Sequence, residues 1–156
     1  MKTLWSWINT FFGGTKEYRR LREYPLFSEL TDYDLYLLSE RMHERSFACG
    51  EQIFEAGYPL EVIYFIRTGE IKLEGALSGK KDKVLAAKEH LGILDMYHSE
   101  ERSSTAHAMS DVVVDAISKS DLIDYMRARH SASFKIFTAI CSDLARFVFD
   151  IAAGKQ

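Results

Sequence analysis

The sequence predicts a mainly β fold with flanking helices, in which the strands form a small antiparallel sandwich or barrel. Between residues 45 and 118, short runs rich in Val, Ile, Phe and Tyr are separated by turn residues. On both sides of this region, the apolar residues repeat at helical spacing. Because no helical segment separates the strands regularly, the pattern favours antiparallel pairing over a parallel sheet.

Length and composition fit one globular domain. The chain has 156 residues, of which 47% are hydrophobic, and a net charge of −3 with acids and bases mixed along it. Without a basic patch, we expect no nucleic acid partner. Two isolated cysteines, Cys49 and Cys141, suggest reduced thiols in the cytoplasm. No apolar run reaches the length of about 18 residues that indicates a membrane span, and the N-terminus does not read as an export signal.

The first element, residues 1–14, is predicted to be an amphipathic helix stopped by Gly13 and Gly14. Two interpretations remain open. The helix could pack on its own domain or on a second copy, or residues 1–12 could make weak contact with a membrane surface. One side of the helix is apolar and consists of Leu4, Trp5, Trp7, Ile8, Phe11 and Phe12.

Residues 15–44 form the second predicted element, a helical segment. The helical pattern extends from residue 18 to residue 45 and is interrupted at Pro25. Thr31 is a suitable N-cap, and Asp32 and Asp34 follow in the first turn. The predicted buried face consists of Leu35, Leu38 and Met42.

Residues 45–118 then contain the predicted β region, with glycines at 50, 57 and 69 between its strands. The expected strands cover residues 52–54, 62–67, 70–74, 83–87, 105–109 and 112–117.

Helical periodicity returns in residues 119–156, where Ser120 is the expected cap and the longest helix covers about residues 132–152. Its apolar residues repeat every three or four positions, and Ile136, Ile140 and Phe147 widen the stripe. Such a stripe can pack on its own domain, but we hypothesise that part of it joins two subunits in a homodimer. We name the following residues the seam: Phe134, Phe137, Cys141, Leu144, Val148 and Ile151.

Three stretches, YPLFSEL, CGEQIFEAG and VIYFIRTGEIKLE, resemble in order and spacing the opening half of a cyclic nucleotide-binding domain of the catabolite-activator type. The resemblance covers residues 21–144. It implies an antiparallel jelly-roll barrel with N-terminal helices and a long C-terminal helix, in a bacterial, cytoplasmic protein of signal transduction. It also implies a regulatory role without catalysis. The sequence contains no catalytic motif, and His90, His98 and His107 do not have the spacing of metal ligands.

In that family the phosphate-binding cassette has a sequence signature in two parts. The first resembles F-G-E and the second, several residues later, resembles P-R-A/S-A-T. Residues 91–106, which contain GILDMYHSEERSSTA, take the place of this cassette. The resemblance implies that Gly92, Ile93 and Leu94 begin a short helix whose backbone faces the cyclic phosphate. It also implies that Arg102 and Ser103 bind that phosphate, and that a glutamate accepts the ribose 2′-hydroxyl proton.

The cassette departs from the family pattern at the residues that matter for the ligand. Ile93 occupies the glutamate position, Glu101 the usual proline and Ser104 the usual alanine. Glu100 and Glu101 would compete with a phosphate for Arg102, or simply pair with it at the surface. A shifted alignment or a rearranged loop would give the ribose acceptor role to Asp95 or Ser104.

These observations favour a non-enzymatic regulatory domain with a degenerate cassette, which binds cyclic nucleotide weakly or not at all. No cofactor is certain, although a cyclic nucleotide or another small anion could bind. The alternatives are a genuine cyclic AMP or cyclic GMP sensor with a rearranged pocket, and an adaptor that contacts proteins or lies near a membrane. Since no helix-turn-helix follows the long helix, we expect no DNA-binding domain and a signal that leaves through a dimer or a separate effector protein.

Overall fold

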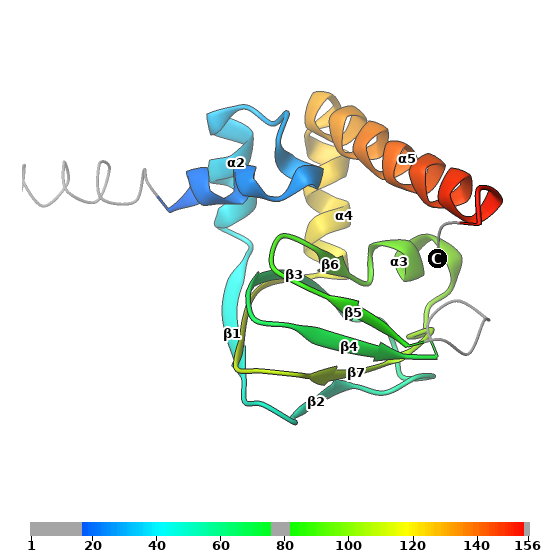
Figure 1. The fold of residues 1–156 in the computed structure, drawn as a ribbon. Helices are drawn as coiled ribbons and strands as arrows, with labels where there is room; N and C mark the ends of the chain where they lie inside the picture. Colours follow the sequence, from blue (N-terminus) through cyan, green and yellow to red (C-terminus); the bar gives the residue numbers. More distant parts are fainter. Residues whose placement is uncertain (1–16, 76–81, 155–156) are drawn as a thin grey trace, which may run out of the picture. The chain divides into compact units, whose positions relative to one another are not determined.

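The computed structural model describes residues 17–75 and 82–154 (Figure 1). They fall into two compact units, one made of residues 40–123 and one that combines residues 17–39 with residues 124–154. The first unit holds the strands and the second holds most of the helical residues. The predicted amphipathic helix over residues 1–14 lies outside the described residues.

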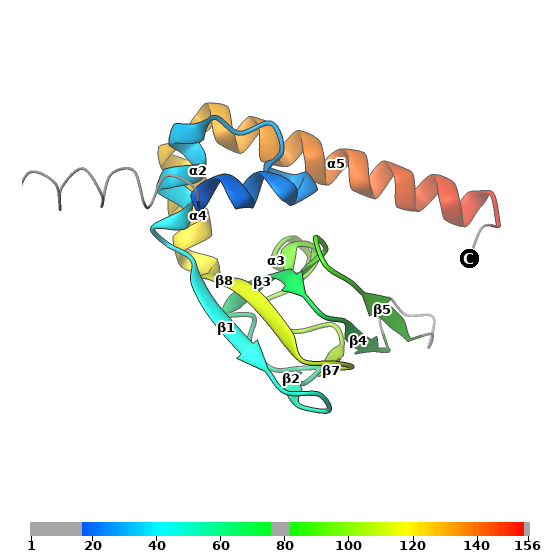
Figure 2. The ribbon, with the colours of Figure 1, turned by 60° about the vertical axis from the view of Figure 1, so that its left-hand side comes forward.

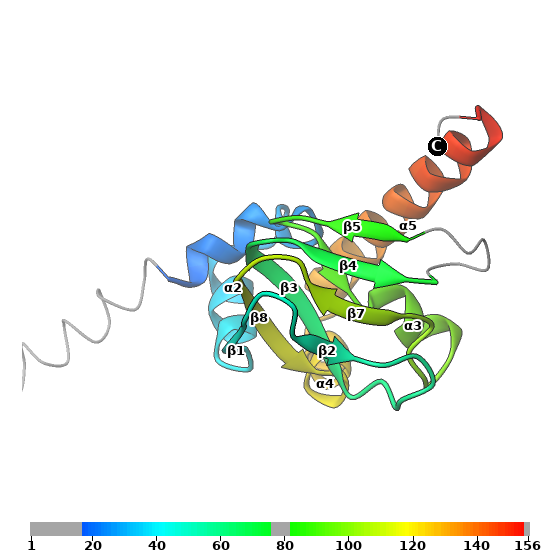
Figure 3. The same ribbon diagram turned by 60° about the horizontal axis from the view of Figure 1, so that its bottom comes forward.

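Two four-stranded antiparallel sheets form the β unit. The first sheet has the order β1-β8-β3-β6, with strands His43–Phe47, Val112–Ser118, Val62–Thr68 and His90–Leu91. The second has the order β2-β7-β4-β5, with strands Gln52–Phe54, Thr105–Ala108, Ile71–Glu74 and Lys83–Leu85. Figure 2 shows β1 beside β8, and Figure 3 shows β4 between β5 and β7.

The core of this unit lies between the two sheets. Buried residues recur at every second position along a strand, as in Val112, Val114 and Ala116 of β8, because successive side chains point to opposite faces of a sheet. Both sheets contribute to one apolar cluster of Tyr64, Ile66, Ile71, Leu85, Leu91, Ala106, Ala108, Val112, Val114 and Ala116. The predicted fold class, an antiparallel jelly roll with flanking helices, is therefore confirmed.

The prediction that helical structure continues to residue 45 is wrong. Helix α2 covers Asp32–Ser39, Met42 lies outside it, and β1 begins at His43. The first four residues of β1 are exposed, so its sequence HERSF lacks the apolar alternation that identifies a strand. What forms this strand is its pairing with β8, which runs from His43 opposite Ala116 to Phe47 opposite Val112.

Other helices also differ from the predicted ones in their boundaries. Residues before α2 form two 3-10 helices, η2 (Tyr18–Glu23) and η3 (Pro25–Phe27). Helix α4 covers Lys119–Ala128, and its cap is Ser118 instead of the expected Ser120, since the Asp121 N–H donates to the Ser118 hydroxyl at 3.0 Å. A short helix α3 covers Ile93–His98, and the longest helix, α5, covers His130–Ala152.

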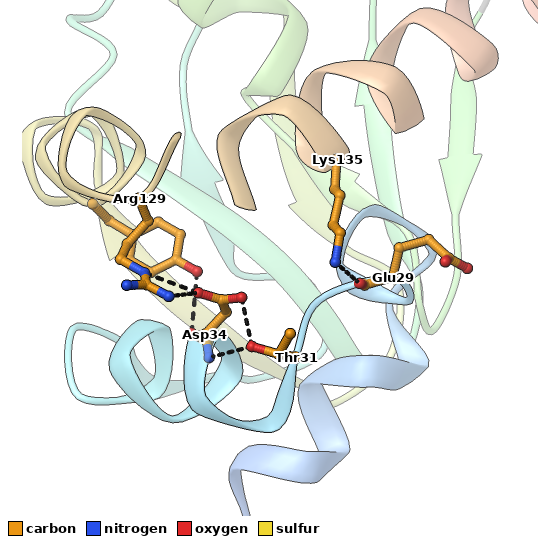
Figure 4. Close-up of polar contacts among 6 residues, drawn as sticks. Glu29, Thr31, Asp34, Arg129 and Lys135 are labelled. Carbon is orange, nitrogen blue, oxygen red and sulfur yellow. Dashed lines mark hydrogen bonds and ion pairs between the residues drawn. The ribbon is translucent and has the colours of Figure 1, made fainter. Parts of the chain in front are cut away.

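Asp34 organises the helical unit (Figure 4). The predicted N-cap is confirmed, because the Asp34 N–H donates to the Thr31 hydroxyl oxygen at 3.1 Å. The Asp34 carboxylate is buried and accepts hydrogen bonds from Thr31 Oγ1 at 2.6 Å and from Arg129 Nε and Nη2 at 2.9 and 2.6 Å. The Tyr125 hydroxyl donates to the Asp34 carbonyl at 3.1 Å. One residue thus links α2 with α4 and with Arg129, the residue before α5.

Helix α5 has two apolar sides with different surroundings. Ala132, Ile136 and Ile140 are buried. The seam is exposed instead, to 73% at Phe134 and 60% at Val148. The helix itself is confirmed, whereas a subunit contact through the seam stays a prediction. Within the described residues, no helix is long and apolar enough to cross a membrane.

Replacing Asp34 by Asn should destabilise the protein by about 2 kcal/mol near neutral pH, because it removes the charge that Arg129 binds. Burial acts to raise the pKa of Asp34, but the hydrogen bonds from Thr31 and Arg129 and the charge of Arg129 together hold it below its ordinary value. Since the folded pKa is depressed, this stabilisation is present above about pH 4 and is lost as the pH falls further. Urea unfolding at neutral pH and at low pH measures both effects.

Asp32→Asn is the matched control, because Asp32 lies in the same first turn but pairs with Arg19 and Arg22 at the surface. We expect a change within about 0.5 kcal/mol. Equal losses for the two variants would contradict the role given to Asp34.

Candidate functional site: the cassette around Arg102

The candidate site is built from residues 91–106, which run from β6 through α3 and a loop to β7. Gly92 joins β6 to α3 with φ 97° and ψ −10°, a left-handed conformation that residues with a side chain rarely adopt. Its carbonyl accepts the first helical hydrogen bond, from the Met96 N–H at 3.0 Å. The glycine at the start of the cassette is therefore required by the backbone.

A second constraint also favours glycine at position 92. A Cβ atom there would lie 2.9 Å from Nη1 of Arg102 and 3.1 Å from the Cδ1 atoms of Ile63 and Leu60. The arginine packs against the space that a side chain at position 92 would fill. Gly92 and Arg102, which the sequence places ten positions apart, are thus direct neighbours.

The Arg102 side chain is buried, with 5% of its surface exposed. Its Nη2 donates to the Val62 carbonyl at 2.5 Å, and its guanidinium carbon lies 3.9 Å from the ring centre of Phe54 and 5.5 Å from that of Tyr64. Such cation–π contacts stabilise a desolvated guanidinium. Nη1 has no hydrogen-bond acceptor within the described part of the chain. The arginine is held in place and retains one unused donor group.

Backbone hydrogen bonds fix the position of this arginine. The Arg102 N–H donates to the Tyr58 carbonyl at 2.8 Å, and the Arg102 carbonyl accepts from the Gly57 N–H at 2.9 Å. The Leu60 N–H donates to the Glu100 carbonyl at 2.8 Å. The turn after β2 therefore supports the cassette, and Thr105 adds to it by accepting from the Ala56 N–H at 3.1 Å.

Asp95 and Ser103 are joined across the cassette. The Ser103 hydroxyl donates to Asp95 Oδ1 at 2.6 Å, which links α3 to the residue that follows Arg102. Burial lowers the pKa of Arg102, whereas the electrostatic effects of Tyr64 and Asp95 act to raise it.

The remaining predicted site residues differ in exposure. Ile93 and Ser104 are buried, and Leu94 is exposed on α3. Glu100 and Glu101 are exposed, and neither forms an ion pair with Arg102 in the residues that the structure describes. A surface ion pair does not explain the arginine. Ligand contacts through Gly92, Ile93, Leu94, Arg102 and Ser103 stay a prediction.

Sequence reasoning missed the aromatic surroundings of Arg102. Phe54 and Tyr64 lie in strands that were predicted, but which rings face the arginine depends on strand pairing that spacing along the chain does not reveal. Tyr64 pairs with Ala116 and Leu91, and its ring is parallel to that of Phe54 within 9°. Among the described residues, no three His, Cys, Asp or Glu side chains are grouped as metal ligands.

Comparison with known proteins connects this geometry to a family. The family model of the cyclic nucleotide-binding domain matches residues 44–129, which include nearly all of the β unit and the whole cassette. The chain belongs to the cyclic nucleotide-binding domain family. Domains of this family are regulatory and not catalytic, and the described residues contain no DNA-binding domain.

Relatives of the family occur in several kinds of protein. The chain is 28% identical over 113 residues to a proposed potassium channel protein of Rhodopseudomonas palustris, and 31% identical over 101 residues to a cAMP-dependent protein kinase regulatory subunit of Hypocrea atroviridis. These matches cover 72% and 64% of the chain but span 27% and 21% of the two relatives.

A solved structure supports the same assignment. The N-terminal domain of a transcriptional regulator from Streptomyces coelicolor is similar with a TM-score of 0.67 and 25% identity, over 82% of this chain and 94% of that one. The fold of this chain is therefore shared with that domain over most of its length.

Gly92→Ala should destabilise the domain more than Gly57→Ala. Both glycines have positive φ, so both variants incur backbone strain of about 1–2 kcal/mol. A Cβ at position 57 meets nothing within 4 Å, whereas one at position 92 would displace Arg102. We expect the loss in unfolding free energy, measured with urea, to be larger at position 92 by about 1 kcal/mol. Equal losses would mean that Arg102 does not press on Gly92.

Proposed function

We propose that this cyclic nucleotide-binding domain is a non-enzymatic regulatory module that binds cyclic nucleotides weakly or not at all. The observation that carries the proposal is Ile93. At the position where family members place the ribose-binding glutamate, this chain has an apolar side chain that is 1% exposed. Ile93 has no group that could accept a hydrogen bond from a ribose hydroxyl.

The missing acceptor at position 93 should lower the affinity for a ribonucleotide substantially. A buried 2′-hydroxyl without an acceptor costs about 1–3 kcal/mol, which corresponds to roughly ten- to a hundredfold in affinity. The Ser103 hydroxyl donates to Asp95 Oδ1, which holds this carboxylate toward Ser103. For Asp95 to accept from a ribose hydroxyl instead, as a genuine sensor would need, the ligand would have to reach the carboxylate in that position.

Calorimetry with cyclic AMP and cyclic GMP tests this proposal directly. We expect no saturable binding in the low micromolar range. Any weaker binding should be equally strong for cyclic AMP and its 2′-deoxy analogue, because position 93 offers no acceptor for the hydroxyl. Low micromolar binding that is lost with the 2′-deoxy analogue would refute the degenerate cassette.

We further propose that the domain acts as a homodimer joined through the seam of α5. The seam residues are spaced by alternating intervals of three and four, as in a two-stranded coiled coil, and none of them is charged. Charged residues of α5 such as Lys135, Asp143 and Arg146 lie off the seam. A long exposed apolar stripe of this kind is characteristic of an interaction surface.

Light scattering should then give twice the mass of one chain at micromolar concentration. Val148→Asp places a charge in the seam and should shift the protein to the monomer. Phe149→Asp is the matched control, because Phe149 is also exposed but lies about 100° further around the helix. A monomeric parent protein, or an equal effect of both variants, would exclude the seam as the dimer contact.

A further inference from the structure

Two polar side chains of the cassette are hydrogen-bonded to each other, and one of them is next to the buried arginine in the sequence. Arg102 is buried and its Nη1 has no acceptor among the described residues. Ser103 follows it directly, and the Ser103 hydroxyl donates to Asp95 Oδ1 at 2.6 Å. The Asp95 charge also acts on the guanidinium. A buried donor group without an acceptor is rare in folded proteins and calls for an explanation.

We propose that the Asp95 carboxylate is an internal anion that keeps phosphate groups away from Arg102 and Ser103. This inference rests on the proposed function and deepens it, because it assigns the loss of anion binding to a second residue besides Ile93. Asp95 would thus decide which ligands the cassette rejects: phosphate esters as a class, whatever sugar or base they carry.

The hydrogen-bonding capacity of Ser103 supports this role. A serine hydroxyl has one proton to donate, and in this structure Asp95 accepts it. A phosphate oxygen could receive that proton only after the bond to Asp95 is broken. Hydrogen bonds to an ionised carboxylate are stronger than those between neutral groups, so breaking this one is costly.

Charge repulsion acts in the same direction. A phosphate beside Ser103 would approach the Asp95 carboxylate, and like charges at short range disfavour one another. Glu100 and Glu101 differ from Asp95, since both side chains are exposed and neither pairs with Arg102 within the described residues. The decisive carboxylate is therefore the one on α3, not the two that precede the arginine in the sequence.

The same bond gives the cassette its shape without a ligand. Asp95 belongs to α3 and Ser103 to the loop before β7, so their contact closes the segment across eight positions of the chain. A bound phosphate would tie the same two parts together from outside. Asp95 supplies that link from within the chain.

Calorimetry on Asp95→Ala and on the parent protein, with cyclic AMP, cyclic GMP and inorganic phosphate, tests the inference. We expect at least one of these anions to bind about tenfold or more tightly to the variant, since repulsion and the competing acceptor are both removed. Glu101→Ala, which removes the same charge from an exposed site, should leave all three affinities unchanged. Arg102→Ala in the Asp95→Ala background should abolish the gain.

Asp95→Asn, which keeps the size of the side chain and removes its charge, guards against a folding defect, and urea unfolding shows whether each variant is folded. No gain in a folded Asp95→Asn or Asp95→Ala protein overturns the inference, and so does an equal gain in Glu101→Ala. The proposed function fails separately, if the parent binds cyclic nucleotide at low micromolar concentration. In that case the ratio of variant to parent affinity still decides the role of Asp95.

Discussion

The burial of the Arg102 guanidinium is the constraint on which the cassette depends. A desolvated charge is unfavourable unless the surrounding groups compensate for it. Here the compensation comes from several elements: the Val62 carbonyl of β3, the Phe54 ring of β2 and the space left by Gly92 before α3. The arginine consequently ties together segments that are far apart in the sequence. Any change that moves it must disturb the contact between β2, β3 and the start of α3.

This dependence separates the structural role of the arginine from its role in ligand binding. In a domain that binds cyclic phosphate, an arginine at this position would be explained by the ligand alone. Here Arg102 has a backbone acceptor and an aromatic neighbour that hold it without a ligand. Its presence in the sequence is therefore compatible with a cassette that binds no nucleotide. The acceptor that is missing at Ile93 and the carboxylate of Asp95 are more informative about occupancy than the arginine is.

The sequence predicted the features that depend on local pattern and missed those that depend on pairing. Strands rich in Val, Ile, Phe and Tyr, such as β3 and β8, are predicted correctly, whereas β1 is not, because only Phe47 at its end is partly buried. The sequence predicts Thr31 as a helix cap correctly from the residues that follow it. For α4 it predicts Ser120 instead of Ser118, because both serines lie just before Asp121. Arg102, between glutamates and serines, reads as a surface residue, and its burial follows only from the turn at residues 57–60 that binds its backbone.

Helix α5 has a second apolar side that its own unit does not cover. A helix needs one apolar side to pack on its own unit, and Ala132, Ile136 and Ile140 provide it. The exposed seam, with a phenylalanine at 73% exposure, is not needed for that packing. An apolar stripe kept in water is unfavourable unless another molecule covers it, which favours a second copy of the helix. Together, the two proposals describe a domain of this family that assembles through α5 and whose arginine, at the phosphate-binding position, is held by packing and not by a phosphate.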